Sequence, residues 1–188
     1  MNTATAQNQK GFTLVEIAIV LVIIGLLLGG VLKGQELITN SKIKSTTQDL
    51  EGIAAAYYAY QDRTGRIPGD STAAPGDGEA DNNQQFWDDL RREGFISGAS
   101  GTAAPRHALD GTFAISPFAT GIFGGTKNFI CATNIEERVA QGMDTKLDDG
   151  IATTGVFIAE LGTTSPLTTA PTADYTQSDA ATVVCKEL

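Results

Sequence analysis

The chain has 188 residues and a formal net charge of −9, from 22 acidic and 13 basic side chains. This length is enough for one modest globular domain. The acidity argues against a general nucleic-acid binder, because neutralising phosphates requires clustered lysine and arginine; solubility alone is the simpler reason for it.

The N-terminal segment joins a polar start to a long apolar run. After Gly11 and Phe12, the run continues to Leu32 with Glu16 as its only charge and without proline. Residues 12–32 are long enough for one helix across the ~30 Å hydrocarbon core of a membrane. A carboxylate at mid-bilayer costs about 2.5–3.5 kcal/mol, so Glu16 is a functional candidate that needs a partner. The alternative is a glutamate at the headgroup boundary with no further role.

The sequence from Lys10 to Glu16, with the apolar run behind it, resembles the type IV pilin and pseudopilin superfamily over about residues 10–44. The resemblance implies that a prepilin peptidase cuts between Gly11 and Phe12, that Phe12 is then N-methylated, and that Glu16 acts in filament assembly. A free α-amino group on Phe12, with a typical pKa near 7.7–8.0, is largely cationic at neutral pH. It would match the Glu16 carboxylate of a neighbouring subunit, and only in the correct register.

The cleavage site would divide the chain into a leader (1–11), a long helix (12–62) and a globular domain (63–188). An ordinary secretory signal has its cleavage site after the apolar run. The candidate glycine here precedes the run, so residues 12–32 would stay in the mature protein as a membrane or filament-core segment.

The helix predicted over residues 12–62 changes character along its length. Leu50, Ile53, Tyr57 and Tyr60 recur on one face, so the second half should be amphipathic and pack on the globular domain. The first half contains four glycines in two small-xxx-small pairs, which allow close helix–helix approach in membranes. Ordinary membrane-helix composition is the alternative explanation. These glycines are Gly25, Gly29, Gly30 and Gly34.

The remaining chain predicts short elements between turns. We expect a helix over 84–94, strands over 112–116, 120–123 and 128–133, a short helix over 135–143, and strands near 155–161 and 182–186. Pro117 would separate the first two strands, and Asn134 would cap the short helix with Glu137 in a capping box. A long helix followed by a small antiparallel sheet is the α+β class of pilin-like proteins.

Two further groups of side chains suggest chemistry. Cys131 and Cys185 predict a disulfide in an exported domain, and the resemblance supports this pairing; two free buried thiols are the alternative. Asp144, Asp148 and Asp149 are weak candidates for calcium ligands, although an Asp-Asp-Gly turn explains them through local hydrogen bonds.

The sequence offers little for an enzyme. The single histidine, His107, lies in a Pro/Ala/Arg stretch where we expect an exposed loop, and nothing selects further catalytic groups. We expect no enzymatic activity and no cofactor.

These features together predict a structural subunit of a type IV pilus or related filament. It would cross the inner membrane once, with its C-terminal domain outside the cytoplasm, before it enters an extracellular pilus or a periplasmic pseudopilus. The implied partners are other pilin-like subunits, the prepilin peptidase/methyltransferase and an inner-membrane assembly platform; nucleic acid is not expected. The alternatives are a type II secretion pseudopilin, a minor pilin that primes or tips the filament, and a monomeric membrane-anchored binding domain.

Overall fold

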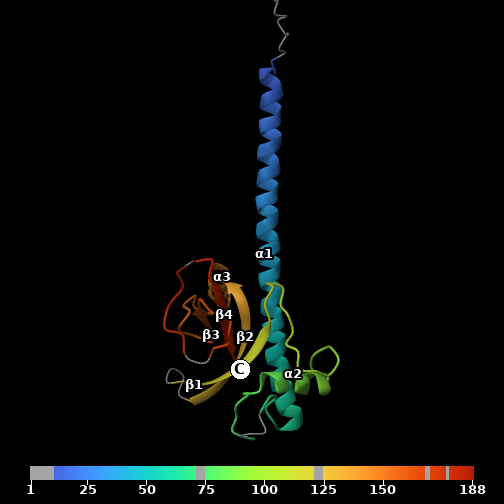
Figure 1. Ribbon diagram of the computed structural model, residues 1–188, viewed down its shortest axis with the longest axis vertical. Helices are drawn as coiled ribbons and strands as arrows, with labels where there is room; N and C mark the ends of the chain where they lie inside the picture. The colour runs from blue at the N-terminus through green and yellow to red at the C-terminus, as the bar shows by residue number, and fades with distance from the viewer. Residues whose placement is uncertain (1–10, 71–74, 121–124, 168–169, 177) are drawn as a thin grey trace, which may run out of the picture. The chain divides into compact units, whose positions relative to one another are not determined.

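The computed structural model describes residues 11–70, 75–120, 125–167, 170–176 and 178–188 (Figure 1). Contacts divide the chain into an N-terminal unit, Met1–Ser41, and a C-terminal unit, Lys42–Leu188. The boundary falls inside the first helix, α1 (Leu14–Thr64). This helix matches the prediction of 12–62 to within two residues, and Gly65, with φ of 68°, follows its last turn.

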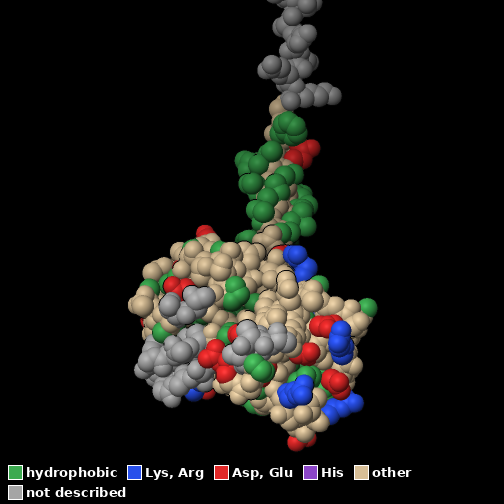
Figure 2. All heavy atoms as spheres, turned by 60° about the horizontal axis from the view of Figure 1, so that its bottom comes forward, with side chains coloured by type: hydrophobic (Ala, Val, Ile, Leu, Met, Phe, Trp, Pro, Cys, Tyr) green, Lys and Arg blue, Asp and Glu red, His purple; other side chains and the backbone are tan. Residues whose placement is uncertain are grey.

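In the N-terminal unit, α1 carries large apolar side chains that are exposed, and Figure 2 shows them on one face of the helix. In the C-terminal unit the same helix is amphipathic. Its buried side chains recur every three or four residues, which places them on one face. They include Ile43 and the four predicted residues Leu50, Ile53, Tyr57 and Tyr60.

Four strands form one antiparallel sheet in the order β1-β2-β4-β3. They are β1 (Phe113–Thr120), β2 (Gly125–Glu136), β3 (Phe157–Leu161) and β4 (Ala181–Glu187). The last strand in the sequence therefore lies inside the sheet, paired with β2 on one side and β3 on the other. Two short helices accompany the sheet, α2 (Asn83–Arg92) and α3 (Glu137–Leu147). The α+β class is confirmed.

The two faces of the sheet bury two separate clusters, because neighbouring residues of a strand point to opposite sides. The larger cluster joins strand residues such as Ile130 and Val184 to apolar side chains of all three helices. The smaller cluster lies on the other face, where Leu167 packs over Phe129 and the two cysteines.

The region around β2 departs from the predicted pattern. Pro117 lies within β1, opposite Asn128, and does not separate two strands. An edge strand tolerates proline because it lacks a neighbour on one side. Of the strand expected over 120–123, Thr120 ends β1 and the other residues fall outside the described part of the chain.

The predicted cap of the short helix is also wrong. Asn134 lies inside β2 with φ of 57°, where the register with β4 shifts. Glu136 precedes α3, and the carboxylate of Glu137 accepts hydrogen bonds from Thr176 and Ser178 instead of closing a capping box. The strand continues because Ile135 is fully buried in the core.

Candidate processing and assembly site

The peptide bond between Gly11 and Phe12 lies just before α1. Gly11, Phe12 and Thr13 are exposed and non-helical, and the helix begins at Leu14. Peptide groups within a helix are occupied by its own hydrogen bonds. The Gly11–Phe12 bond lies outside the hydrogen-bonded helix, in an exposed segment that is accessible to a peptidase.

Thr13 and Glu16 form a capping box at the start of α1. The Thr13 backbone N–H and hydroxyl donate to Oε2 of Glu16 at 2.9 and 2.8 Å, and the Glu16 N–H donates to the Thr13 hydroxyl at 3.2 Å. These bonds satisfy donors that a helix start otherwise leaves free. The sequence analysis did not identify this contact, although threonine followed three residues later by glutamate before an apolar run is its usual signature. The Glu16 carboxylate thus already has a partner within its own chain.

Behind this cap, α1 is long and apolar enough to cross a membrane, with a mean hydropathy of 2.8 over its most apolar window. A methyl group added at Gly25, Gly29, Gly30 or Gly34 would meet nothing within 4 Å. The single chain therefore has no steric need for these glycines. Close contacts with other helices and ordinary membrane-helix composition both remain as explanations of the two small-xxx-small pairs.

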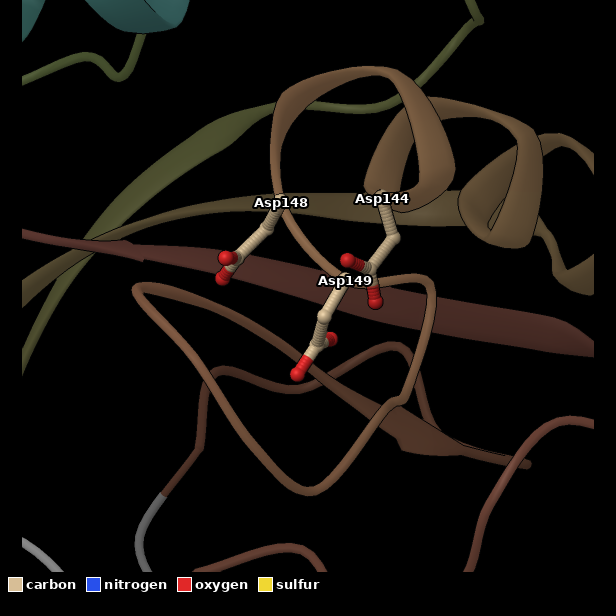
Figure 3. Close-up of side chains that lie close together, drawn as sticks. All are labelled: Asp144, Asp148 and Asp149. Atoms are coloured by element: carbon tan, nitrogen blue, oxygen red, sulfur yellow. The ribbon is translucent and has the colours of Figure 1, made fainter.

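The three candidate calcium ligands do come together. Asp144, in the last turn of α3, and Asp148 and Asp149, just after it, have carboxylate oxygens within 4.8 Å of one another (Figure 3).

The same carboxylates, however, are used by the surrounding chain. Asp144 accepts from the Gly150 N–H at 3.1 Å and from the Tyr175 hydroxyl at 2.9 Å. Oδ2 of Asp148 accepts from two backbone N–H groups of the segment leading into β3, at 2.6 and 3.0 Å. Asp149 accepts from a backbone N–H and from the Thr154 hydroxyl. These bonds account for the acidic residues as the builders of a turn.

Burial gives the carboxylates of this turn different acidities. Asp144 is fully buried, and loss of hydration raises its pKa against the hydrogen bonds from Tyr175 and Gly150, which lower it. Burial and the nearby Asp144 charge also raise the pKa of the Tyr175 hydroxyl. The exposed Asp149 has a lowered pKa, chiefly because the Thr154 hydroxyl donates to it.

His107 is buried, contrary to the prediction of an exposed loop residue; only 5% of its surface is accessible. Nε2 lies 2.9 Å from the Thr133 carbonyl oxygen, and Nδ1 accepts from the Leu109 N–H at 3.2 Å. A neutral ring protonated at Nε2 satisfies both contacts. Any side chain on Gly111 would collide with the ring and with that carbonyl oxygen, so glycine is required there.

Cys131 and Cys185 form a disulfide, as the sequence analysis expected. They lie directly opposite each other on β2 and β4, and both are fully buried.

Comparison with known proteins identifies a motif in the N-terminal segment. Residues 6–32 match the family described as the prokaryotic N-terminal methylation motif. The chain carries this N-terminal motif. The matched residues include Gly11, Phe12, Thr13 and Glu16. The apolar helix behind the motif fits membrane anchoring before assembly.

Among solved structures, the chain is similar to the major type IV pilin PilA1 from Clostridium difficile. The identity is 14% and the TM-score 0.42, over 80% of this chain and 96% of that one. No curated protein matched the chain.

Proposed function

We propose that the chain is the precursor of a structural subunit of a type IV pilus or related filament, cleaved after Gly11 and polymerised through α1. The match of residues 6–32 to the methylation motif carries this proposal. Two features of the site support it. The Gly11–Phe12 bond is exposed and non-helical, and α1 presents apolar side chains that a single chain leaves uncovered.

In this proposal Glu16 has two successive partners. Its carboxylate closes the capping box within one chain. After cleavage, the α-amino group of Phe12 is cationic at neutral pH and supplies a matching charge on the neighbouring subunit. A buried charge that is paired only in the correct register favours that register. A prepilin peptidase/methyltransferase and an inner-membrane platform are the partners that processing and assembly require.

The test is the intact mass and N-terminal sequence of the protein recovered from sheared surface filaments. We expect a chain that begins at N-methylated Phe12 and is abundant in that fraction. A processed chain confined to the membrane fraction would instead indicate a pseudopilin or a minor pilin. An uncleaved chain beginning at Met1, in cells that have the peptidase, would contradict the proposal and leave an anchored binding domain.

A further inference from the structure

An open groove lies along α1 in the C-terminal unit. It has a volume of about 540 Å³ and is lined by α1, the chain after α2, and the segment leading into β1. Its apolar lining includes Ile53, Phe95 and Phe113. Concave sites of this size with apolar walls and a few polar groups are typical binding sites.

Gly52 lines this groove from the interior of α1. A glycine inside a helix weakens it relative to alanine. A methyl group added at Gly52 would meet nothing within 4 Å, so no contact within the chain explains the residue. With glycine at this position, no side chain fills this part of the groove.

A second surface lies elsewhere on the same unit. The acidic turn, which we define as residues 144–156, exposes the apolar side chains Leu147, Ile151 and Val156. The carboxylates of Asp144, Asp148 and Asp149 hold its backbone through the hydrogen bonds described above. A surface whose backbone is fixed in this way loses little conformational entropy when it binds.

The groove and the acidic turn border opposite sides of α1. Four helix residues line the groove: Gln48, Asp49, Gly52 and Ile53. Three others line a pocket with Leu147 and Val156 of the turn: Thr47, Leu50 and Glu51. At 100° per residue, these two sets are centred about 180° apart around the helix. Figure 1 likewise shows α3, which leads into the turn, and α2, which leads into the groove, on opposite sides of α1.

The two surfaces also differ in charge. Arg91 and Arg106 line the groove together with one acid, Asp49. The turn exposes two acids, Asp148 and Asp149, and one base, Lys146, beside its apolar side chains, so its exposed charge is negative. Opposite charges around an apolar contact favour one partner and one orientation.

We propose that the acidic turn of one copy docks into the groove of the next copy. Two different surfaces on opposite sides of one molecule form a heterologous contact, which repeats from copy to copy and builds an open array. The inference rests on the proposed function, since a filament is such an array, and it adds a contact between C-terminal units to the contacts made by the N-terminal helix.

Cysteine cross-linking of the full chain tests the contact. Gln48→Cys places a thiol at the groove, and Ile151→Cys places one on the turn; both positions are exposed. The native cysteines are joined in a buried disulfide, so the introduced thiols alone react with a short bismaleimide. The double variant should give a ladder of covalent multimers, both in sheared filaments and in membranes. Each single variant should remain monomeric, because a heterologous contact does not bring two identical positions together.

Every other result contradicts the docking contact, the filament function or both. Filaments that form without a ladder would overturn the docking contact and leave the filament function standing. A ladder in membranes without any filaments would support the contact and contradict the filament function. Absence of both would overturn both, and dimers from a single variant would show a symmetric contact instead.

A second variant tests the groove itself. Gly52→Leu adds a side chain at the groove whose Cβ meets nothing within 4 Å, and it replaces a glycine inside a helix, so the melting temperature should be unchanged or higher, while the ladder from the cysteine pair is lost. Gly142→Leu is the matched control, because this glycine of α3 also faces open space and lies outside both surfaces. A full ladder in the Gly52→Leu background would overturn the proposal.

Discussion

At the scale of single residues, the Glu16 carboxylate combines a local role with the proposed role between subunits. Glutamine at this position retains the capping box but removes the charge. We therefore predict that Glu16→Gln abolishes filament assembly as fully as Glu16→Ala does, because both lose the charge that would pair with the Phe12 amine. Filament yield after shearing measures the effect. Normal assembly of either variant would show that the Glu16 charge is not used.

His107 gives a pH-dependent prediction at the same scale. Burial lowers its pKa below the ordinary value of 6.5, against weaker opposite effects of the Thr133 carbonyl and the nearby Asp110 and Asp49 carboxylates; the Arg106 charge adds to the lowering. Between the lowered pKa and 6.5, the unfolded chain binds more protons than the folded chain. The His107 contribution to stability is therefore complete above about pH 6.5 and is lost as the pH falls through that range.

The variant His107→Gln isolates this effect, since its amide can still donate to the Thr133 carbonyl but does not titrate. The stability difference between wild type and variant should shrink from about pH 7.5 to about pH 5, because only the wild type loses the histidine contribution. Urea unfolding of the detergent-solubilised chain at both values measures it. A difference that is constant with pH would show that His107 does not titrate in the folded chain.

The burial of His107 also shows where sequence reasoning reaches its limit. The partner that holds its ring is the carbonyl of Thr133, which lies 26 residues later in the sequence, on β2. A proline-, alanine- and arginine-rich stretch contains no local signal of that contact. The capping box of Thr13 and Glu16 is the opposite case, because its pattern is local and could have been found from the sequence.

At the scale of elements, the acidic turn depends on the link between Asp144 and Tyr175. Tyr175→Phe removes the hydroxyl that donates to the buried Asp144 carboxylate. A hydrogen bond to a charged group contributes about 1.5–3 kcal/mol, so we predict a loss of that order in the free energy of unfolding. Tyr58→Phe is the control, because Tyr58 is half-exposed on α1. Equal stability of the two variants would show that the Tyr175 hydroxyl does not hold the turn.

Elements with a regular apolar pattern could be predicted closely. The amphipathic half of α1 follows from the spacing of Leu50, Ile53, Tyr57 and Tyr60, all of which are buried. The segment around β2 could not be predicted closely, because the conformation of its residues depends on which strands lie beside them in the sheet. Proline is accepted at position 117 since β1 is an edge strand, and Asn134 adopts a positive φ where the pairing with β4 shifts. Sequence alone reveals neither the edge nor the shift.

At the scale of the whole molecule, the C-terminal unit is completed by the last strand of the chain. β4 pairs with both β2 and β3, so the sheet is continuous only when the C-terminus is in place. The disulfide fixes this arrangement by joining β4 to β2 across a sequence separation of 54 residues. On the chain-entropy model, a closed loop of this length stabilises the folded state by about 4 kcal/mol.

The double variant Cys131→Ala/Cys185→Ala should therefore lower the melting temperature of the C-terminal unit by about 10 °C. Circular dichroism at a wavelength dominated by the sheet measures the transition, in detergent and without reductant. Reducing the wild-type chain with a thiol should produce a similar decrease, which separates loss of the cross-link from loss of side-chain volume in the cluster with Phe129 and Leu167. If the double variant has the same melting temperature as the oxidised wild type, the sheet is stable without the cross-link. Packing of β4 between its neighbours is then sufficient to complete the sheet.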